Sequence, residues 1–224
     1  MTPWRRAAAL ALAACSLASP RLTRGQGAPG RPPARARGDT AARAARDGLI
    51  PAGFGTLRQD QVAIRMQTLG LTVSAIPLEE SVIRTLAPDS YRSLHALRES
   101  KNAALAALAS RNGVSSVQAW YVTFFNIQQG EARFDAFDFV VRSAGQDYRP
   151  LDALPLTPGF GGGRVAQRGQ QSAVYAFDPQ IDLDQPLTVA SLGQQTTVWG
   201  DATLPLVERE RSAVWSRAAA AKPF

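Results

Sequence analysis

The segments WYVTFFNI (120–127), RFDAFDFVV (133–141), DYRPLDALPL (147–156), SAVYAFD (172–178) and PLTV (186–189) decide the fold of this chain. Each is a short apolar run of strand length, and Gly, Pro, Asp or Asn separates it from the next. The first of them is apolar on both faces, which is typical of a central strand. Turns recur about every eight to twelve residues, and this spacing predicts a mainly β fold built as an antiparallel β-sandwich.

Two further patterns extend the predicted sandwich toward the amino terminus. Apolar and polar residues alternate over residues 62–66 and again over 71–75, which predicts a β-hairpin with one buried face. Leucines recur at helical spacing over residues 89–111, with Asp89 or Ser90 as N-cap, so we expect one inserted amphipathic α-helix there. This helix either packs across the sandwich or presents its leucine stripe to a partner protein.

The net charge of the chain is concentrated in its first 48 residues. The 224 residues carry a formal net charge of +7, with 25 basic and 18 acidic side chains. Nine of the arginines but only two of the acids lie within residues 1–48, so residues 49–224 are formally neutral. Nucleic acid is therefore not expected as a partner, because its binding depends on a basic surface.

Residues 1–18 have the three parts of an export signal, namely a basic start, an apolar stretch and small residues beyond it. Cys15, the only cysteine, ends the sequence LAAC (12–15), which resembles the lipobox of bacterial lipoproteins. In that family the cysteine is diacylated, and its acyl chains hold the mature protein on the membrane. The alternative is an ordinary signal that is cut after Ala18. Both routes predict an exported protein, in the periplasm or at the cell surface.

The rest of the chain divides into three parts. Residues 16–48 contain Arg, Ala, Gly and Pro with almost no large apolar side chains, which predicts a disordered tether. Residues 49–205 hold the predicted sandwich and its helix. Residues 206–224 form a tail that is either a short helix docked by Val214 and Trp215 or a frayed end.

The order of features from residue 117 to residue 193 resembles a known type of domain. Asn126 ends the long strand, and Phe134 and Phe139 follow five residues apart. YRP (148–150) comes next, a Gly-rich loop follows, and FDP (177–179) precedes the segment PLTV. These features resemble the immunoglobulin-like extracytoplasmic domains of bacterial lipoproteins and envelope proteins of unassigned function. The resemblance implies an immunoglobulin-like β-sandwich that binds or supports rather than catalyses, since these domains share no catalytic residues.

Several chemistries lack the residues that they require. One cysteine and one histidine exclude a disulfide within the chain and a structural zinc site. The loop TPGFGGGR (157–164) lacks the Lys-Ser/Thr ending of a phosphate-binding loop, so no nucleotide and no other cofactor is expected. His95 is a candidate general base, but the pattern favours a half-exposed residue of the helix, because no serine nucleophile or orienting carboxylate can be assigned to it.

Acidic residues leave two possibilities open. Asp178, Asp182 and Asp184 lie within seven residues, a spacing that suits oxygen ligands of calcium. Turn and strand-surface roles are the favoured interpretation of these three, because Asp178 precedes a proline and the other two alternate with Ile181 and Leu183.

A pair of carboxylates for glycoside hydrolysis is the second possibility. Its candidates are Glu79, Glu80, Asp135 and Asp138. Asp135 and Asp138 would lie on opposite faces of a strand and would not pair with each other. The sequence thus favours a non-catalytic envelope protein that binds another protein or a surface polymer, and the alternative is a carboxylate-dependent hydrolase acting on envelope polymers.

Overall fold

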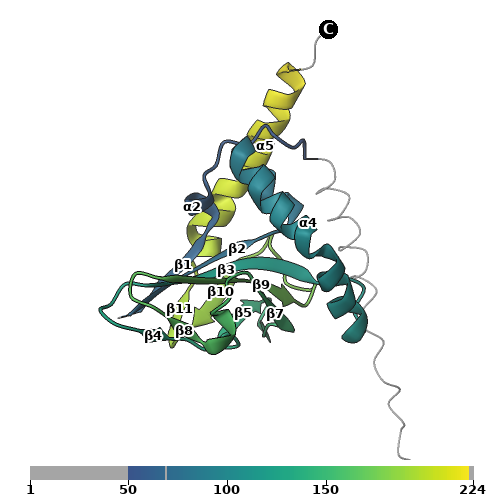
Figure 1. Ribbon diagram of the computed structural model, residues 1–224. Coiled ribbons are helices and arrows are strands. Elements are labelled where there is room, and N and C mark those ends of the chain that lie inside the picture. The colour runs from purple at the N-terminus through teal and green to yellow at the C-terminus, as the bar shows by residue number, and fades with distance from the viewer. Residues whose placement is uncertain (1–49, 69, 222–224) are drawn as a thin grey trace, which may run out of the picture.

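The computed structural model describes residues 50–68 and 70–221 as a mainly antiparallel β fold with a few helices (Figure 1). Within these residues, a five-stranded sheet has the order β1 (Ile64–Gln67), β2 (Leu71–Pro77), β3 (Gln118–Asn126), β9 (Gln170–Phe177) and β7 (Asp152–Pro155). A four-stranded sheet has the order β11 (Gln194–Thr196), β10 (Leu187–Ser191), β5 (Phe139–Ser143) and β6 (Gln146–Tyr148). Two short strands, β4 (Ala132–Arg133) and β8 (Arg164–Val165), pair with each other. The mainly β architecture is confirmed, whereas the export signal, the lipobox cysteine and the tether lie outside the described residues.

The inner faces of the two larger sheets pack on one another through buried aromatic rings. Phe139 of β5 contacts Trp120 of β3 and Phe177 of β9, with ring centroids 6.5 and 5.9 Å apart. All three side chains are fully buried, and they belong to one core that includes residues of both sheets. Burial of this apolar surface is the main favourable contribution to folding.

Strand β3 lies at the centre of the five-stranded sheet, as its two apolar faces predict. Trp120, Val122 and Phe124 face the other sheet and are fully buried. On the opposite face Tyr121 pairs with Val174 of β9, and Val174 is also fully buried. The helix α4 (Pro88–Arg111) lies over this second face (Figure 1).

The predicted helix at residues 89–111 corresponds to α4, which begins one residue earlier, at Pro88. Proline suits the first turn, where its fixed φ is helical and its missing N–H is not needed. Leu94, Leu105 and Leu108 are buried in the core that the sheets share, so α4 packs on the sheet with its leucine stripe.

Three further α-helices occur in the described residues: α2 (Gln59–Val62), α3 (Glu80–Ile83) and α5 (Leu204–Ala220). In α5 Val214 is buried, but Trp215, which we expected to dock the tail, is 46% exposed. No helix in residues 50–68 and 70–221 is long and apolar enough to cross a membrane.

The two prolines of residues 148–156 mark a change of sheet. Strand β6 ends at Tyr148 in the four-stranded sheet, and β7 begins at Asp152 at the edge of the five-stranded sheet. Pro150 lies in the connection, and Pro155 ends the edge strand. Edge and crossover positions are where proline is tolerated, because no ladder N–H is needed there.

Two predicted strands differ from the structure. The run 133–141 is broken after Arg133, where β4 ends, because the Asp135 side chain accepts the N–H of Phe137 at 2.8 Å and forms a turn. Residues 196–199 also predict a closing strand, but β11 ends at Thr196, and Trp199 begins the π-helix η2 (Trp199–Thr203). The fully buried indole of Trp199 donates its N–H to the carbonyl oxygen of Leu183 at 3.1 Å.

Replacing Phe139 by Ala should destabilise the protein by about 3–5 kcal/mol, because it opens a cavity between the two sheets. The matched control is Phe125→Ala on the outer face of β3, where the side chain is 40% exposed and the expected loss is about 1 kcal/mol or less. Urea unfolding of the two variants measures both values. Equal losses would contradict the packing described.

Candidate functional site

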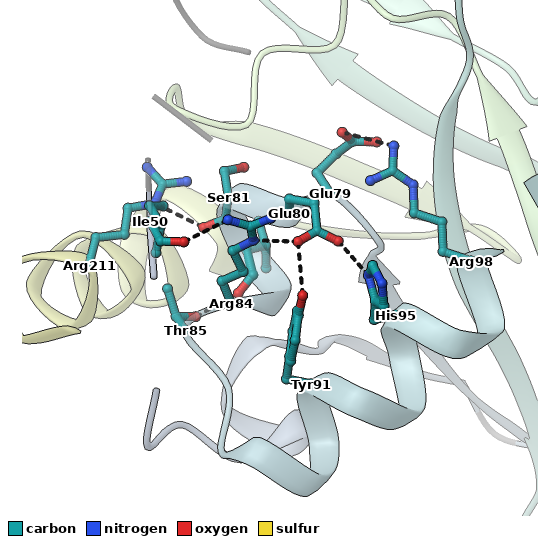
Figure 2. Close-up of polar contacts among 11 residues, drawn as sticks. Ile50, Glu79, Glu80, Ser81, Arg84, Thr85, Tyr91, His95, Arg98 and Arg211 are labelled. Atoms are coloured by element: carbon teal, nitrogen blue, oxygen red, sulfur yellow. Dashed lines mark hydrogen bonds and ion pairs between the residues drawn. The ribbon is translucent and has the colours of Figure 1, made fainter. Parts of the chain in front are cut away.

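A cluster of polar side chains joins the short helix α3 to the long helix α4 (Figure 2). At its centre is Glu80, whose Oε1 lies 2.8 Å from Nδ1 of His95 and whose Oε2 accepts a hydrogen bond from Nε of Arg84 at 2.5 Å. The hydroxyl of Tyr91 donates to Oε2 at 3.4 Å, and its ring stacks on the imidazole with centroids 5.3 Å apart. We refer to Glu80, Arg84, Tyr91 and His95 as the Glu80 cluster.

Burial and hydrogen bonding act in opposite directions on the ionisation of this cluster. Burial raises the pKa of the Glu80 carboxyl, but the hydrogen bonds from Arg84 and His95 outweigh it and lower the pKa below its ordinary value. Burial lowers the pKa of Arg84, and the bond to Glu80 more than reverses this. Burial and the charge of Glu80 both raise the pKa of Tyr91. Glu80 is therefore held as a carboxylate that accepts hydrogen bonds.

Neighbouring contacts tie α3 to other parts of the chain. Arg211 of α5 donates to the backbone oxygen of Ser81 at 3.0 Å and to Oδ1 of Asp184 at 2.8 Å. Nη2 of Arg98 on α4 lies 3.8 Å from Oε2 of Glu79 (Figure 2). These contacts thus connect α3 to both α4 and α5.

His95 has the position expected of a half-exposed helix residue, since 41% of its side chain is exposed. Its partner in the structure is Glu80, a carboxylate that the sequence alone did not assign to it. Among the described residues, no serine or threonine hydroxyl is hydrogen-bonded to His95. The hydrogen bonds of the Glu80 cluster hold α3 against α4, and they do not form the nucleophile, base and acid arrangement of a catalytic triad.

A pocket of about 460 Å³ lies where the edge strand β7, the turn 134–137 and the short helix η1 (Phe160–Gly162) meet. We call it the edge pocket. Its lining consists of aromatic and small residues with two carboxylates. The lining residues are Phe134, Asp135, Ala136, Phe137, Asp152, Ala153, Pro155, Phe160, Gly161, Gly162 and Gly163. Its volume is within the range usual for small-ligand sites.

Two local features of the chain shape the edge pocket. The Asp135 turn leaves Phe137 50% exposed in the lining. Gly163 has a φ of +61°, and a Cβ there would lie 2.6 Å from the backbone oxygen of Phe134. The backbone N–H of Phe134 donates to the carbonyl oxygen of Gly163 at 2.9 Å. The two backbones therefore lie so close together that only glycine fits at position 163.

Tyr175 neighbours the lining of the edge pocket, but it is fully buried and is not itself a lining residue. It is the cross-strand partner of Ala153, and its ring lies 6.1 Å from that of Phe160, centroid to centroid. Burial and the charge of Asp135 raise the pKa of its hydroxyl. Within the described residues this buried hydroxyl has no hydrogen-bond partner. It therefore has unused hydrogen-bonding capacity beside the pocket.

Two of the three calcium candidates form turns, and the third pairs with an arginine. Oδ1 of Asp178 accepts the N–H of Gln180 at 2.8 Å, and Oδ1 of Asp182 accepts that of Asp184 at 2.8 Å. Asp184 also pairs with Arg211. No group of three or more His, Cys, Asp or Glu side chains in residues 50–68 and 70–221 is placed to hold a metal ion.

The four candidate carboxylates of the hydrolase hypothesis occupy three different environments. Glu79 and Glu80 belong to the contacts around α3, and Asp135 lines the edge pocket. Oδ2 of Asp138 accepts the N–H of Leu192 at 2.8 Å and so fixes the turn after β10. Asp152 is the second acid of the edge pocket, and no pattern in the sequence pointed to it.

The stability of the protein should decrease as the pH falls below about 4.5, the ordinary pKa of a glutamic acid. The pKa of Glu80 is lower in the folded protein than in the unfolded chain. Its stabilising effect is therefore present above the unfolded value and is lost as the pH falls through the folded value.

Glu80→Gln should lower the free energy of unfolding at pH 7 by about 1 kcal/mol and should make its acid dependence shallower. The control Asp89→Asn removes an exposed ion pair with Arg92 and should leave the acid dependence unchanged. Urea unfolding between pH 3 and pH 7 checks both variants. An unchanged slope in Glu80→Gln would show that the Glu80 cluster does not stabilise the fold.

Comparison with known proteins gives no family assignment. No family model, no curated protein and no solved structure matches the chain. The likeness to immunoglobulin-like envelope domains stays a prediction from sequence. The edge pocket and the Glu80 cluster are therefore the features of the described residues that bear on function.

Proposed function

We propose that this protein is an exported, non-catalytic binding module of the bacterial envelope, and that the edge pocket receives part of a surface polymer or of a protein ligand. The observation that carries the proposal is the pocket itself. It combines apolar walls with a few polar groups, which is the usual composition of a ligand site. Its lining comes from three separate segments held in place by the packed sheets, so the site is formed before the ligand arrives.

The hydrogen bonds of the acidic and basic side chains favour ligand binding over catalysis as the function. Glu80 is hydrogen-bonded to both His95 and Arg84, and the bond to His95 holds α3 against α4. Asp138 holds a backbone N–H of another turn. These groups have structural roles, whereas Asp135 and Asp152 are the acids that face the pocket.

The proposed scaffold is an immunoglobulin-like sandwich, and Cys15 is the proposed point of attachment to the membrane. The two packed antiparallel sheets support the first part, and the sequence LAAC at residues 12–15 supports the second. A lipid-anchored tether would hold the edge pocket outside the cytoplasm within reach of envelope polymers.

The alternative function is a carboxylate-dependent hydrolase of envelope polymers, with Asp135 and Asp152 as its acids. Two carboxylates in one pocket are the observation that favours it. Hydrolysis of envelope polymers by the wild type, lost in both Asp135→Asn and Asp152→Asn, would select this function over binding alone.

Filling the edge pocket should weaken binding to the envelope. Gly162 lines the pocket, and a Cβ there would meet no atom within 4 Å, so Gly162→Leu should fold and obstruct the site. In cosedimentation with isolated envelope fractions, we expect the affinity of the variant to fall by about tenfold. A tenfold loss of affinity corresponds to about 1.4 kcal/mol of binding free energy. The control Ala190→Leu lies on the outer face of the four-stranded sheet and should bind as the wild type does. Equal binding of all three proteins would contradict the proposal.

Mass spectrometry of the mature amino terminus tests the proposed anchor. Acylation predicts a chain that begins at Cys15 with a diacylglyceryl group on its sulfur, and Cys15→Ala should release the protein from membranes. An unmodified chain that begins after Ala18 would show a secreted protein without a lipid anchor.

A further inference from the structure

The charged side chains that line the edge pocket are both acidic. Oδ1 of Asp135 accepts the N–H of Phe137, and Asp135 has no ion-pair partner among the described residues. Oδ2 of Asp152 lies 3.7 Å from Nη2 of Arg111, whose side chain is 69% exposed. An exposed arginine at this distance is screened by solvent and neutralises Asp152 only in part. The pocket therefore presents net negative charge.

The walls around these carboxylates are apolar. Phe134 and Phe160 are buried, with ring centroids 5.3 Å apart, and Phe137 extends the wall to the surface. Charge of one sign in a concave site with low-dielectric walls attracts ligands of the opposite charge. Aromatic rings add to this attraction when the cation approaches their faces.

Both charged side chains of the lining are hydrogen-bond acceptors. A ligand that donates hydrogen bonds and carries a positive charge therefore complements Asp135 and Asp152. A bare metal ion fits less well, since no group of three metal-ligating side chains occurs in the described residues.

We propose that the edge pocket binds a primary ammonium group carried on an apolar stem or on a sugar ring. The N–H bonds of the ammonium point to Asp135 and Asp152, and the carbon skeleton lies against the phenylalanine rings. This assignment rests on the proposed function, because it names the chemistry of the ligand that the same pocket receives. An amino sugar or a diamino acid side chain of an envelope polymer has the required group.

The test compares amines with neutral alcohols of the same shape. Cadaverine is paired with 1,5-pentanediol, and glucosamine is paired with glucose, in calorimetric titrations of the full chain at low salt. We expect each amine to bind at least about tenfold more tightly than its neutral counterpart, since a charge-assisted hydrogen bond contributes more than a neutral one. The preference should decrease as salt is added.

Two variants test whether the amines bind in the edge pocket. In Asp135→Asn the amide oxygen still accepts the Phe137 N–H, so the turn is kept while the charge is lost, and amine affinity should fall by about tenfold. Asp147→Asn removes an exposed carboxylate that pairs with Arg142 on the four-stranded sheet, and it should have no effect.

The outcomes separate this inference from the proposed function. Equal binding of an amine and its alcohol, or amine binding unchanged in Asp135→Asn, overturns the ammonium site. If neither ligand of a pair binds while Gly162→Leu still loses envelope binding, the ammonium site is wrong and the binding module stands. If Gly162→Leu also binds envelope normally, both proposals fail.

Discussion

The contact of Phe139 with Trp120 and Phe177 is the interaction on which the rest of the structure depends. It joins the four-stranded sheet to the five-stranded sheet, and through them it fixes where the connecting segments lie. The turn 134–137 leads directly into β5, so its position relative to β7 is set by how β5 packs. The edge pocket is thus a consequence of sheet packing, because its walls come from segments that meet only when the two sheets are together.

The two polar sites have different physical characters. In the Glu80 cluster, opposite charges are paired at short distances, and the hydrogen bonds lower the pKa of the central carboxyl. Charge pairs of this kind stabilise a particular arrangement of helices, and they leave little free bonding capacity for a substrate. In the edge pocket Asp135 has no ion-pair partner among the described residues, and Asp152 has an exposed arginine 3.7 Å away. A ligand that enters the pocket can form the hydrogen bonds and the charge pairs that these carboxylates lack.

Local patterns in the sequence predicted the elements but not the site. The apolar faces of residues 117–127 predicted the central strand, and the leucine spacing predicted α4, because both signals depend on neighbours in the chain. Asp152 lines the same pocket as Asp135 only because β7 pairs with β9 and the two sheets pack together. Likewise, His95 and Glu80 are fifteen residues apart, and their contact depends on how α4 folds back on α3. Such long-range contacts leave no periodic signal in one sequence.

The most direct test of the central claim is to map, by amide chemical-shift changes, where solubilised envelope fragments bind to the folded protein. We expect the changes to be confined to residues 134–137, 152–155 and 160–163, which surround the edge pocket. The amides of Glu80, Tyr91 and His95 should keep their shifts, because the Glu80 cluster serves the fold. Changes centred on those three residues, with none around the pocket, would contradict the account.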